Sequence, residues 1–119
     1  MSEIIEFKGK EYVCLNNIMY KYVKKYNNLR NNFKEIDNAD EEMIKILIEA
    51  ICPSIKIEQT KEDFLVDGQE LKYDELEILL IKLRTAFNKI IETSLAYVFE
   101  NNTKKNELKE KNANGAIVK

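Results

Sequence analysis

Histidine and tryptophan are absent from the 119-residue sequence, and glycine, cysteine and proline are scarce, with three, two and one residues respectively. Because histidine is the commonest general base in enzymes and a frequent metal ligand, its absence argues against most acid–base and metal-dependent catalysis. The glycines, Gly9, Gly68 and Gly115, are too far apart to form a glycine-rich phosphate-binding loop. We therefore expect a protein that is not an enzyme, with no catalytic residue, no cofactor and no metal.

The two cysteines, Cys14 and Cys52, are too few for a disulfide framework and lack the close spacing of a zinc site. Neither has a histidine partner that could activate it as a nucleophile. Since no signal-peptide pattern is found at the N-terminus, we expect reduced thiols with a buried structural role, in a cytoplasm. The longest apolar runs are short, such as residues 78–81, so we expect no membrane span.

Two groups of carboxylates remain as candidates for a cation site. Residues 40–42 read Asp-Glu-Glu at the expected start of a helix, where negative charge meets the positive end of the helix dipole. Glu62 and Asp63, together with Asp67, lack the spacing of a calcium-binding loop. We expect both groups to be solvated surface.

The charge is mixed in sign and unevenly distributed along the chain. The net charge is −2, and residues 101–119 contain five Lys and two Glu, so this tail carries +3 and residues 1–100 carry −5. An acidic body argues against a general attraction to nucleic acid. A base-stacking platform beside Lys21, Lys24 and Lys25 could consist of Tyr12, Tyr20, Tyr22 and Tyr26. Helical spacing, however, places Tyr22 and Tyr26 on an apolar stripe. We therefore favour a core edge with one exposed ring.

The N-terminal half is typical of a β-hairpin followed by two helices. In residues 3–15 apolar and polar side chains alternate on either side of Gly9, which predicts a short hairpin with a tight turn. Apolar residues at spacings of three and four then predict a helix over residues 16–33, capped by one of the two asparagines at its start. A second, highly apolar helix is expected over residues 40–52, because acidic residues begin it and a proline follows it.

The next segment admits two interpretations. Strand-like alternation on both sides of Asp67 and Gly68, a pair suited to a type I′ turn, predicts a second hairpin over residues 55–73. The alternative is a short helix over residues 60–65 with Thr60 as its N-cap. We favour the hairpin.

The longest apolar pattern predicts a helix over residues 74–100, with Asp74 as the N-cap and Glu77 completing a capping box. The main stripe of this helix alternates spacings of four and three, and consists of Leu76, Leu80, Leu83, Phe87, Ile90, Ser94 and Tyr97. Residues 101–119 are too polar to offset the entropy cost of ordering, so we expect a flexible tail there, although residues 107–111 could extend a frayed helix.

These elements predict an α+β fold: a mainly helical single domain over residues 1–100, with one or two short β-hairpins and a long C-terminal helix, followed by a flexible polar tail over residues 101–119. The predicted core draws on the first hairpin and all three helices. It includes Phe7, Ile18, Tyr22, Tyr26, Leu47, Ile51, Leu76, Leu80, Leu83, Phe87 and Ile90.

The helix expected over residues 74–100 has more apolar surface than one core requires. At about 100° per residue, Ile78, Ile81 and Phe99 lie more than about 120° from the centre of the main stripe, and Leu95 lies near its edge. Either the helix is sandwiched inside the domain, or this second surface binds a partner protein or another copy of the chain. These four residues are therefore the candidate partner-binding residues.

The order of the segments also resembles that of a known family. A hairpin motif leads directly into an amphipathic helix, and the residues that carry the motif are Ile5, Phe7, Gly9, Lys10, Glu11, Tyr12, Leu15 and Asn16. An acidic helix that ends near a proline, a final apolar helix and a polar tail follow. In this layout, over most of residues 3–100 but not over residues 54–73, the chain is similar to the small tail assembly chaperones of long-tailed phages and prophages of low-GC Gram-positive bacteria.

The resemblance implies a non-enzymatic chaperone in the host bacterial cytoplasm. Such proteins coat the long helical tape-measure protein, keep it soluble and help to bring tail-tube subunits during assembly. A helix with surplus apolar surface suits that role. The alternative is a small acidic phage or mobile-element protein that inhibits or regulates a host protein by masking a basic site. Both hypotheses expect a protein partner, no nucleic acid and no membrane, and both leave a homo-oligomer open.

Overall fold

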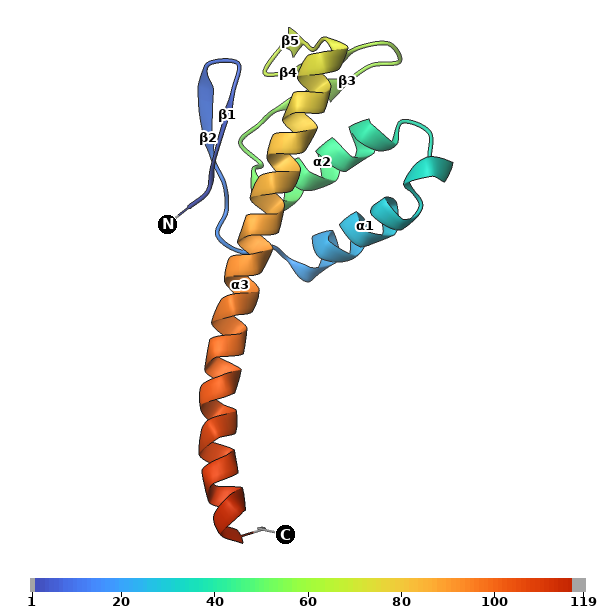
Figure 1. Cartoon of the computed structure of the whole chain (residues 1–119). Helices are drawn as coiled ribbons and strands as arrows, with labels where there is room; N and C mark the ends of the chain where they lie inside the picture. Colours follow the sequence, from blue (N-terminus) through green and yellow to red (C-terminus); the bar gives the residue numbers. More distant parts are fainter. Residues whose placement is uncertain (1, 117–119) are drawn as a thin grey trace.

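The computed structural model describes the backbone of residues 2–116 and the side chains of residues 2–96. Within this part of the chain, helices and two small antiparallel sheets form an α+β fold with a long C-terminal helix, as predicted (Figure 1). The elements are β1 (Ile4–Phe7), β2 (Lys10–Val13), α1 (Tyr20–Asn31), the 3₁₀ turn η1 (Phe33–Glu35), α2 (Ala39–Ile51), β3 (Ile57–Gln59), β4 (Phe64–Val66), β5 (Gln69–Glu70) and α3 (Tyr73–Ala116).

The first hairpin, β1–β2, forms where the alternating pattern predicts it. Its two-residue turn consists of Lys8 and Gly9, with φ values of 52° and 78°, which is the positive φ that a type I′ turn requires. The register pairs Phe7 with Lys10 and Ile5 with Tyr12. Because side chains alternate between the two faces of a strand, one face of the hairpin enters the core and the other faces solvent.

Helix α1 begins at Tyr20, so the prediction of a helix from residue 16, capped by an asparagine, is wrong at this end. The backbone N–H of Leu15 donates a hydrogen bond to the carbonyl oxygen of Ile51, at 2.7 Å. This hydrogen bond holds the chain after β2 against the end of α2, so the helix begins only several residues beyond Leu15. No side chain caps the start of α1.

Helix α2 follows its prediction closely and supplies the centre of the core. It begins after Asn38, which has a left-handed φ of 57°, and it ends at Ile51, just before Cys52 and Pro53. Acidic side chains occupy its first turn, next to the positive end of the helix dipole. Its fully buried side chains include Met43, Ile44, Leu47 and Ile51.

The second hairpin is also present, and the alternative short helix over residues 60–65 does not form. Asp67 and Gly68, with φ values of 51° and 79°, make the turn between β4 and β5. Strand β3 adds to the other edge of β4, so the sheet order is β3-β4-β5. Thr60 instead closes the β3–β4 loop, since its hydroxyl oxygen accepts a hydrogen bond from the N–H of Asp63 at 2.9 Å.

Helix α3 starts one residue earlier than predicted and uses a different cap. The Glu75 carboxylate accepts a hydrogen bond from the backbone N–H of Lys72 at 2.9 Å, which is the arrangement of a capping box with Lys72 at the N-cap. The expected box of Asp74 and Glu77 is therefore wrong. Because α3 contains 44 residues, it is roughly 66 Å long at 1.5 Å per residue.

Helix α3 also continues past the predicted end at residue 100, as far as Ala116. It runs along the longest dimension of the molecule, which measures 67 × 33 × 19 Å. The flexibility expected for residues 101–119 in solution stays a prediction.

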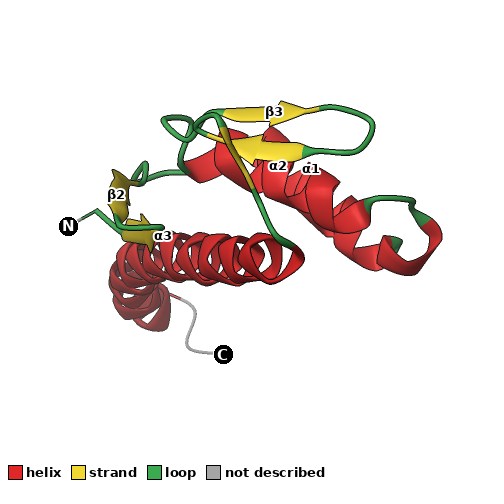
Figure 2. Cartoon of the chain, turned by 90° about the horizontal axis from the view of Figure 1, so that it is seen from above, coloured by secondary structure: helices red, strands yellow, loops and turns green. Residues whose placement is uncertain are grey.

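The core lies between α2, the first half of α3 and the inner faces of the two sheets. Tyr26 of α1 stacks on Phe87 of α3, with ring centroids 4.4 Å apart. Leu79 is fully buried although it lies outside the predicted stripe, and Leu76, which belongs to that stripe, is only half-buried. The remaining elements lie to one side of α3, so the opposite face of this helix is uncovered (Figures 1 and 2).

Candidate functional site

Three of the four candidate partner-binding residues are exposed on α3. Ile78 is 45% exposed, Ile81 60% and Leu95 48%, although large apolar side chains on a helix of the core are usually covered. The side chain of the fourth, Phe99, lies outside the described residues. The helix is therefore not sandwiched at Ile78 and Ile81, whose side chains form exposed apolar surface. That this surface binds a partner stays a prediction.

The one-sided covering of α3 explains this exposure. Leu79, Leu83 and Phe87 face α2 and the sheets and are fully buried. Ile81 lies two residues before Leu83, and therefore about 200° around the helix from it. The side chains whose burial stabilises the fold therefore lie on one face of α3, and Ile78 and Ile81 stay in contact with water on the other face.

Strand β1 extends this apolar surface beside α3. A shallow pocket of about 270 Å³ lies between them, with Ile4 and Ile5 on the strand side and Ile81 and Ala86 on the helix side. Ile4 is 55% exposed. We call Ile4, Ile78, Ile81 and the pocket between β1 and α3 the α3–β1 face.

Ile4 was not among the predicted site residues, although a signal for it exists in the sequence. Ile4 and Ile5 are consecutive apolar residues in a strand, so one of them must point away from the core. The register pairs Ile4 with Val13, and both are exposed on the outer side of the hairpin. An apolar pair on the solvent side of an otherwise polar hairpin face indicates a surface with a further role.

Two lysines of α3 hold β1 in place at this face. The ammonium group of Lys82 donates a hydrogen bond to the carbonyl oxygen of Glu6 at 2.5 Å, and Lys89 lies 3.7 Å from the carboxylate of Glu3. In this antiparallel register the backbone groups of Glu6 point away from β2, so Lys82 covers part of an open strand edge. The α3–β1 face therefore has an apolar centre and a charged rim, which is common in protein interfaces.

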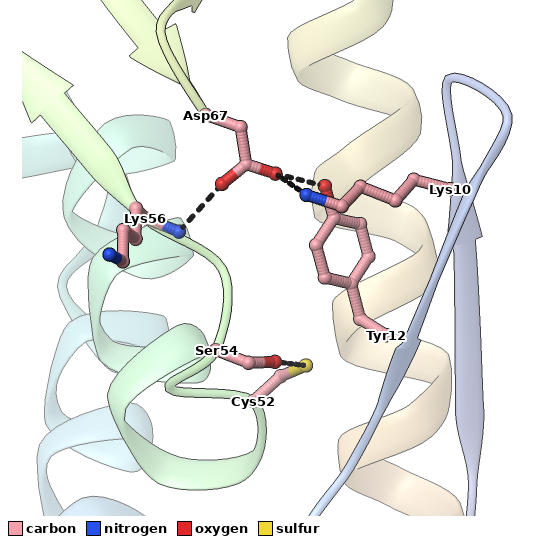
Figure 3. A network of polar contacts seen from close by, with 6 residues as sticks. All are labelled: Lys10, Tyr12, Cys52, Ser54, Lys56 and Asp67. Carbon is pink, nitrogen blue, oxygen red and sulfur yellow. Dashed lines mark hydrogen bonds and ion pairs between the residues drawn. The ribbon is translucent and has the colours of Figure 1, made fainter.

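A separate polar network joins the two hairpins (Figure 3). The hydroxyl of Tyr12 and the ammonium of Lys10 donate hydrogen bonds to one carboxylate oxygen of Asp67, the latter at 3.3 Å. The other oxygen accepts a hydrogen bond from the backbone N–H of Lys56, also at 3.3 Å. Asp67 is therefore not the freely solvated carboxylate expected from the sequence, because its position in the turn between β4 and β5 aims it at the first hairpin.

The protonation states of this network are those of a structural contact. Burial, followed by the hydrogen bond to Asp67, raises the pKa of Tyr12 to about 12. The hydrogen bond from Tyr12 is the main cause that lowers the pKa of Asp67 below its usual value. The phenol keeps its proton and the carboxylate keeps its charge, so neither group is prepared for proton transfer near neutral pH.

The N-terminal end of α3 carries paired carboxyl groups. The nearby carboxyl group of Asp40 is the main cause that raises the pKa of Glu77, and that of Asp63 does the same for Glu70. Tyr73 is exposed beside them, and the charge of Glu77 raises its pKa. Because like charges are held together, this end of the molecule favours a positively charged neighbour.

The expected tyrosine arrangement on α1 is confirmed. Tyr26 is buried, Tyr22 is half-buried and Tyr20 is exposed. The ammonium groups of Lys21 and Lys25 lie over the ring of Tyr22, at 5.0 and 5.7 Å from its centre. The three rings therefore do not form a common surface on which bases could stack.

In the described part of the chain, no helix combines the length and apolar character needed to cross a membrane. Among the same residues, no three His, Cys, Asp or Glu side chains converge in a way that could hold a metal ion. Comparisons with protein-family models, with curated proteins and with solved structures find no match to this chain.

Proposed function

We propose that this protein is a non-enzymatic binding module that takes an apolar helix of a partner protein on its α3–β1 face. The observation that carries the proposal is the exposure of Ile78 and Ile81 on a helix whose opposite side forms the core. Ile4 and the adjoining pocket widen this surface, so that a partner helix would find a groove beside α3.

The energetics suit a moderate and reversible association. Covering the exposed parts of Ile78 and Ile81 contributes on the order of 1–3 kcal/mol, before the entropy cost of association is subtracted. A stable complex therefore needs further contacts along the partner. Helix α3 is long enough to supply them, because it continues from the α3–β1 face to Ala116.

The specific function that we propose is that of a phage tail assembly chaperone acting in the host bacterial cytoplasm. Its partner would be the helical tape-measure protein, which needs its apolar surface covered before assembly. The resemblance in segment order supports this proposal, and so does an uncovered apolar helix face. In the absence of the tape-measure protein, a homo-oligomer would use the same face, because a second copy would also cover Ile78 and Ile81.

The alternative is an acidic protein that masks a basic site on a host protein. The paired carboxyl groups at the N-terminal end of α3, Asp40 with Glu77 and Asp63 with Glu70, favour it. A basic partner would relieve the repulsion within each pair. Binding of this kind would weaken steeply with salt, whereas binding at the α3–β1 face would not.

Co-expression with the tape-measure protein from the same gene neighbourhood tests the proposal. We expect a soluble complex that survives high salt and that is lost in Ile81→Glu, because a charge would be buried at the interface. Tyr20→Glu is the matched control, since it changes an exposed apolar side chain on α1. If Ile81→Glu folds and binds normally, the α3–β1 face is not the docking surface.

The same experiment distinguishes the alternative. Under the masking hypothesis, the tape-measure protein does not bind. A complex with a basic host protein would instead be lost in the double variant Asp40→Asn, Glu77→Gln and would keep its affinity in Ile81→Glu. Circular dichroism of each variant shows whether its fold is intact.

A further inference from the structure

Cys14 and Cys52, which are far apart in the sequence, lie side by side in the core. Cys14 directly follows β2 and Cys52 directly follows α2. Their exposed fractions are 3% and 0%. Both are free thiols.

Contacts on both sides of Cys14 hold the two cysteines together. The N–H of Leu15 bonds to the carbonyl oxygen of Ile51 at 2.7 Å, and the sulfur of Cys52 lies 3.7 Å from the carbonyl oxygen of Val13. The residues before and after Cys14 are thus each bound to the end of α2. Cys14 lies between Val13 and Leu15, so these two contacts place it next to Cys52.

We propose that Cys14 and Cys52 form a redox-active dithiol that closes into an intramolecular disulfide by exchange with a low-molecular-weight disulfide. The thiolate of Cys52 attacks one sulfur of the small disulfide and displaces one small thiolate. Cys14 then loses its proton to solvent, and its sulfur attacks the Cys52 sulfur and displaces the second small thiolate. In sum, two protein thiols are oxidised and one small disulfide is reduced to two thiols.

The surroundings assign the first attack to Cys52. The neighbouring Cys14 thiol lowers the pKa of Cys52, and the hydroxyl oxygen of Ser54 lies 3.6 Å from the Cys52 sulfur (Figure 3). The neighbouring Cys52 in turn raises the pKa of Cys14. Because the thiolate is the reacting species, Cys52 is the nucleophile and Cys14 resolves the mixed disulfide.

A route to the buried sulfurs exists in the segment between β2 and α1. Residues 14–19 form no helix or strand, and Leu15 and Met19 within them are exposed. Local opening of this segment would uncover both thiols while α2 and α3 stay packed. Closure of the disulfide would then fasten the β1–β2 hairpin, and with it Ile4 of the α3–β1 face, to the end of α2.

The test uses the reduced full-length protein in a series of native buffers with rising ratios of oxidised to reduced glutathione. We expect the intact mass to fall by two hydrogen atoms, and a non-reducing digest to contain the peptides of Cys14 and Cys52 joined together. The oxidised form should melt at a higher temperature, and dithiothreitol should reverse the shift. If both thiols stay free in oxidised glutathione alone, under conditions in which the denatured chain reacts, the proposal is overturned.

Two variants test the order of attack. Cys14→Ser should accumulate a stable glutathione adduct on Cys52, because the resolving thiol is missing. Cys52→Ser should leave Cys14 unmodified in the native protein. Equal modification of both variants would overturn the assigned roles. If either variant is unfolded by circular dichroism, the mass and the digest of the unmutated protein decide the proposal by themselves.

Discussion

At the scale of single residues, the contact between Tyr12 and Asp67 shows how this small fold connects its two sheets. Asp67 has the positive φ of a turn residue and also accepts hydrogen bonds from Tyr12, Lys10 and the backbone of Lys56. The turn conformation and the contact therefore depend on the same residue. A hydrogen bond between a phenol and a charged carboxylate, partly shielded from water, is stronger than one between neutral groups.

Tyr12→Phe should lower the free energy of unfolding by about 1–2 kcal/mol near neutral pH, because Asp67 loses a donor. The pKa of Tyr12 is raised from 10.0 to about 12 in the folded protein, so its contribution is fully present below pH 10 and is lost as the pH rises through 12. Urea titrations of both proteins across this range should show the difference shrinking toward zero.

Tyr20→Phe is the control for this experiment, because the Tyr20 ring is exposed on α1. It should match the unmutated protein at every pH. A difference between Tyr12→Phe and the unmutated protein that stays constant to pH 12 would show that the Tyr12 phenol is not held by Asp67.

On the acid side, the lowered pKa of Asp67 predicts stability that is present above pH 3.8 and is lost as the pH falls through its folded-state value.

At the scale of elements, α3 has two faces with different roles and a start that is set by its neighbours. Its inner face, with Leu79, Leu83 and Phe87, is fully buried, whereas Ile78 and Ile81 are exposed. The carboxylate of Glu75 caps the helix and also lies 3.1 Å from the ammonium of Lys8 in the first hairpin. This tertiary ion pair helps to place Glu75 rather than Glu77 at the cap.

Glu75→Ala should lower the Tm more than Asp74→Ala does, because only the former leaves the backbone N–H of Lys72 without its acceptor. Asp74 accepts a hydrogen bond only from the next residue, Glu75. Thermal melts followed by circular dichroism give the comparison. Lys8→Asn removes the ion pair with Glu75 but leaves the cap, so it measures the contribution of the ion pair by itself. Asparagine tolerates the positive φ of residue 8. If Asp74→Ala instead lowers the Tm more than Glu75→Ala does, the capping box of Asp74 and Glu77 predicted from the sequence is the correct one.

At the scale of the whole molecule, the core occupies one end and α3 extends from it. The buried cluster joins both hairpins, α1, α2 and the part of α3 up to Ile90, within the described side chains. One continuous core predicts one cooperative unfolding transition. The α3–β1 face is an outer surface of the same unit, so a change there should leave that transition in place.

Leu83→Ala should cost on the order of 2–5 kcal/mol, because Leu83 is fully buried and truncation of its side chain leaves a cavity in the core. Urea unfolding followed by tyrosine fluorescence and by circular dichroism should give coincident transitions at a lower midpoint. Ile81→Glu, on the same helix, should leave the midpoint nearly unchanged. A Leu83→Ala midpoint equal to that of the unmutated protein would show that this face of α3 does not carry the core.

Local patterns decided several features of the fold without help from the rest of the chain. Alternation around Gly9 and around Asp67–Gly68 was sufficient for both hairpins, since a two-residue turn with positive φ fixes the register of its strands. The apolar content of residues 40–52 and the proline after them located α2. Helical spacing separated the buried Leu83 and Phe87 from the exposed Ile81.

Other features depended on which segments meet in space. Helix α1 starts late because Leu15 bonds to Ile51, and the cap of α3 shifts to Glu75. Cys14 lies next to Cys52 because β2 packs against the end of α2. The spacing of the two cysteines in the sequence does not predict this proximity. The sequence by itself determined the periodic elements and the surplus apolar face of α3, because each depends on neighbours within a few residues. Only the tertiary structure decided that Ile4 and Ile81 line one pocket and that Cys14 lies next to Cys52, because these arrangements join strands and helices distant along the chain.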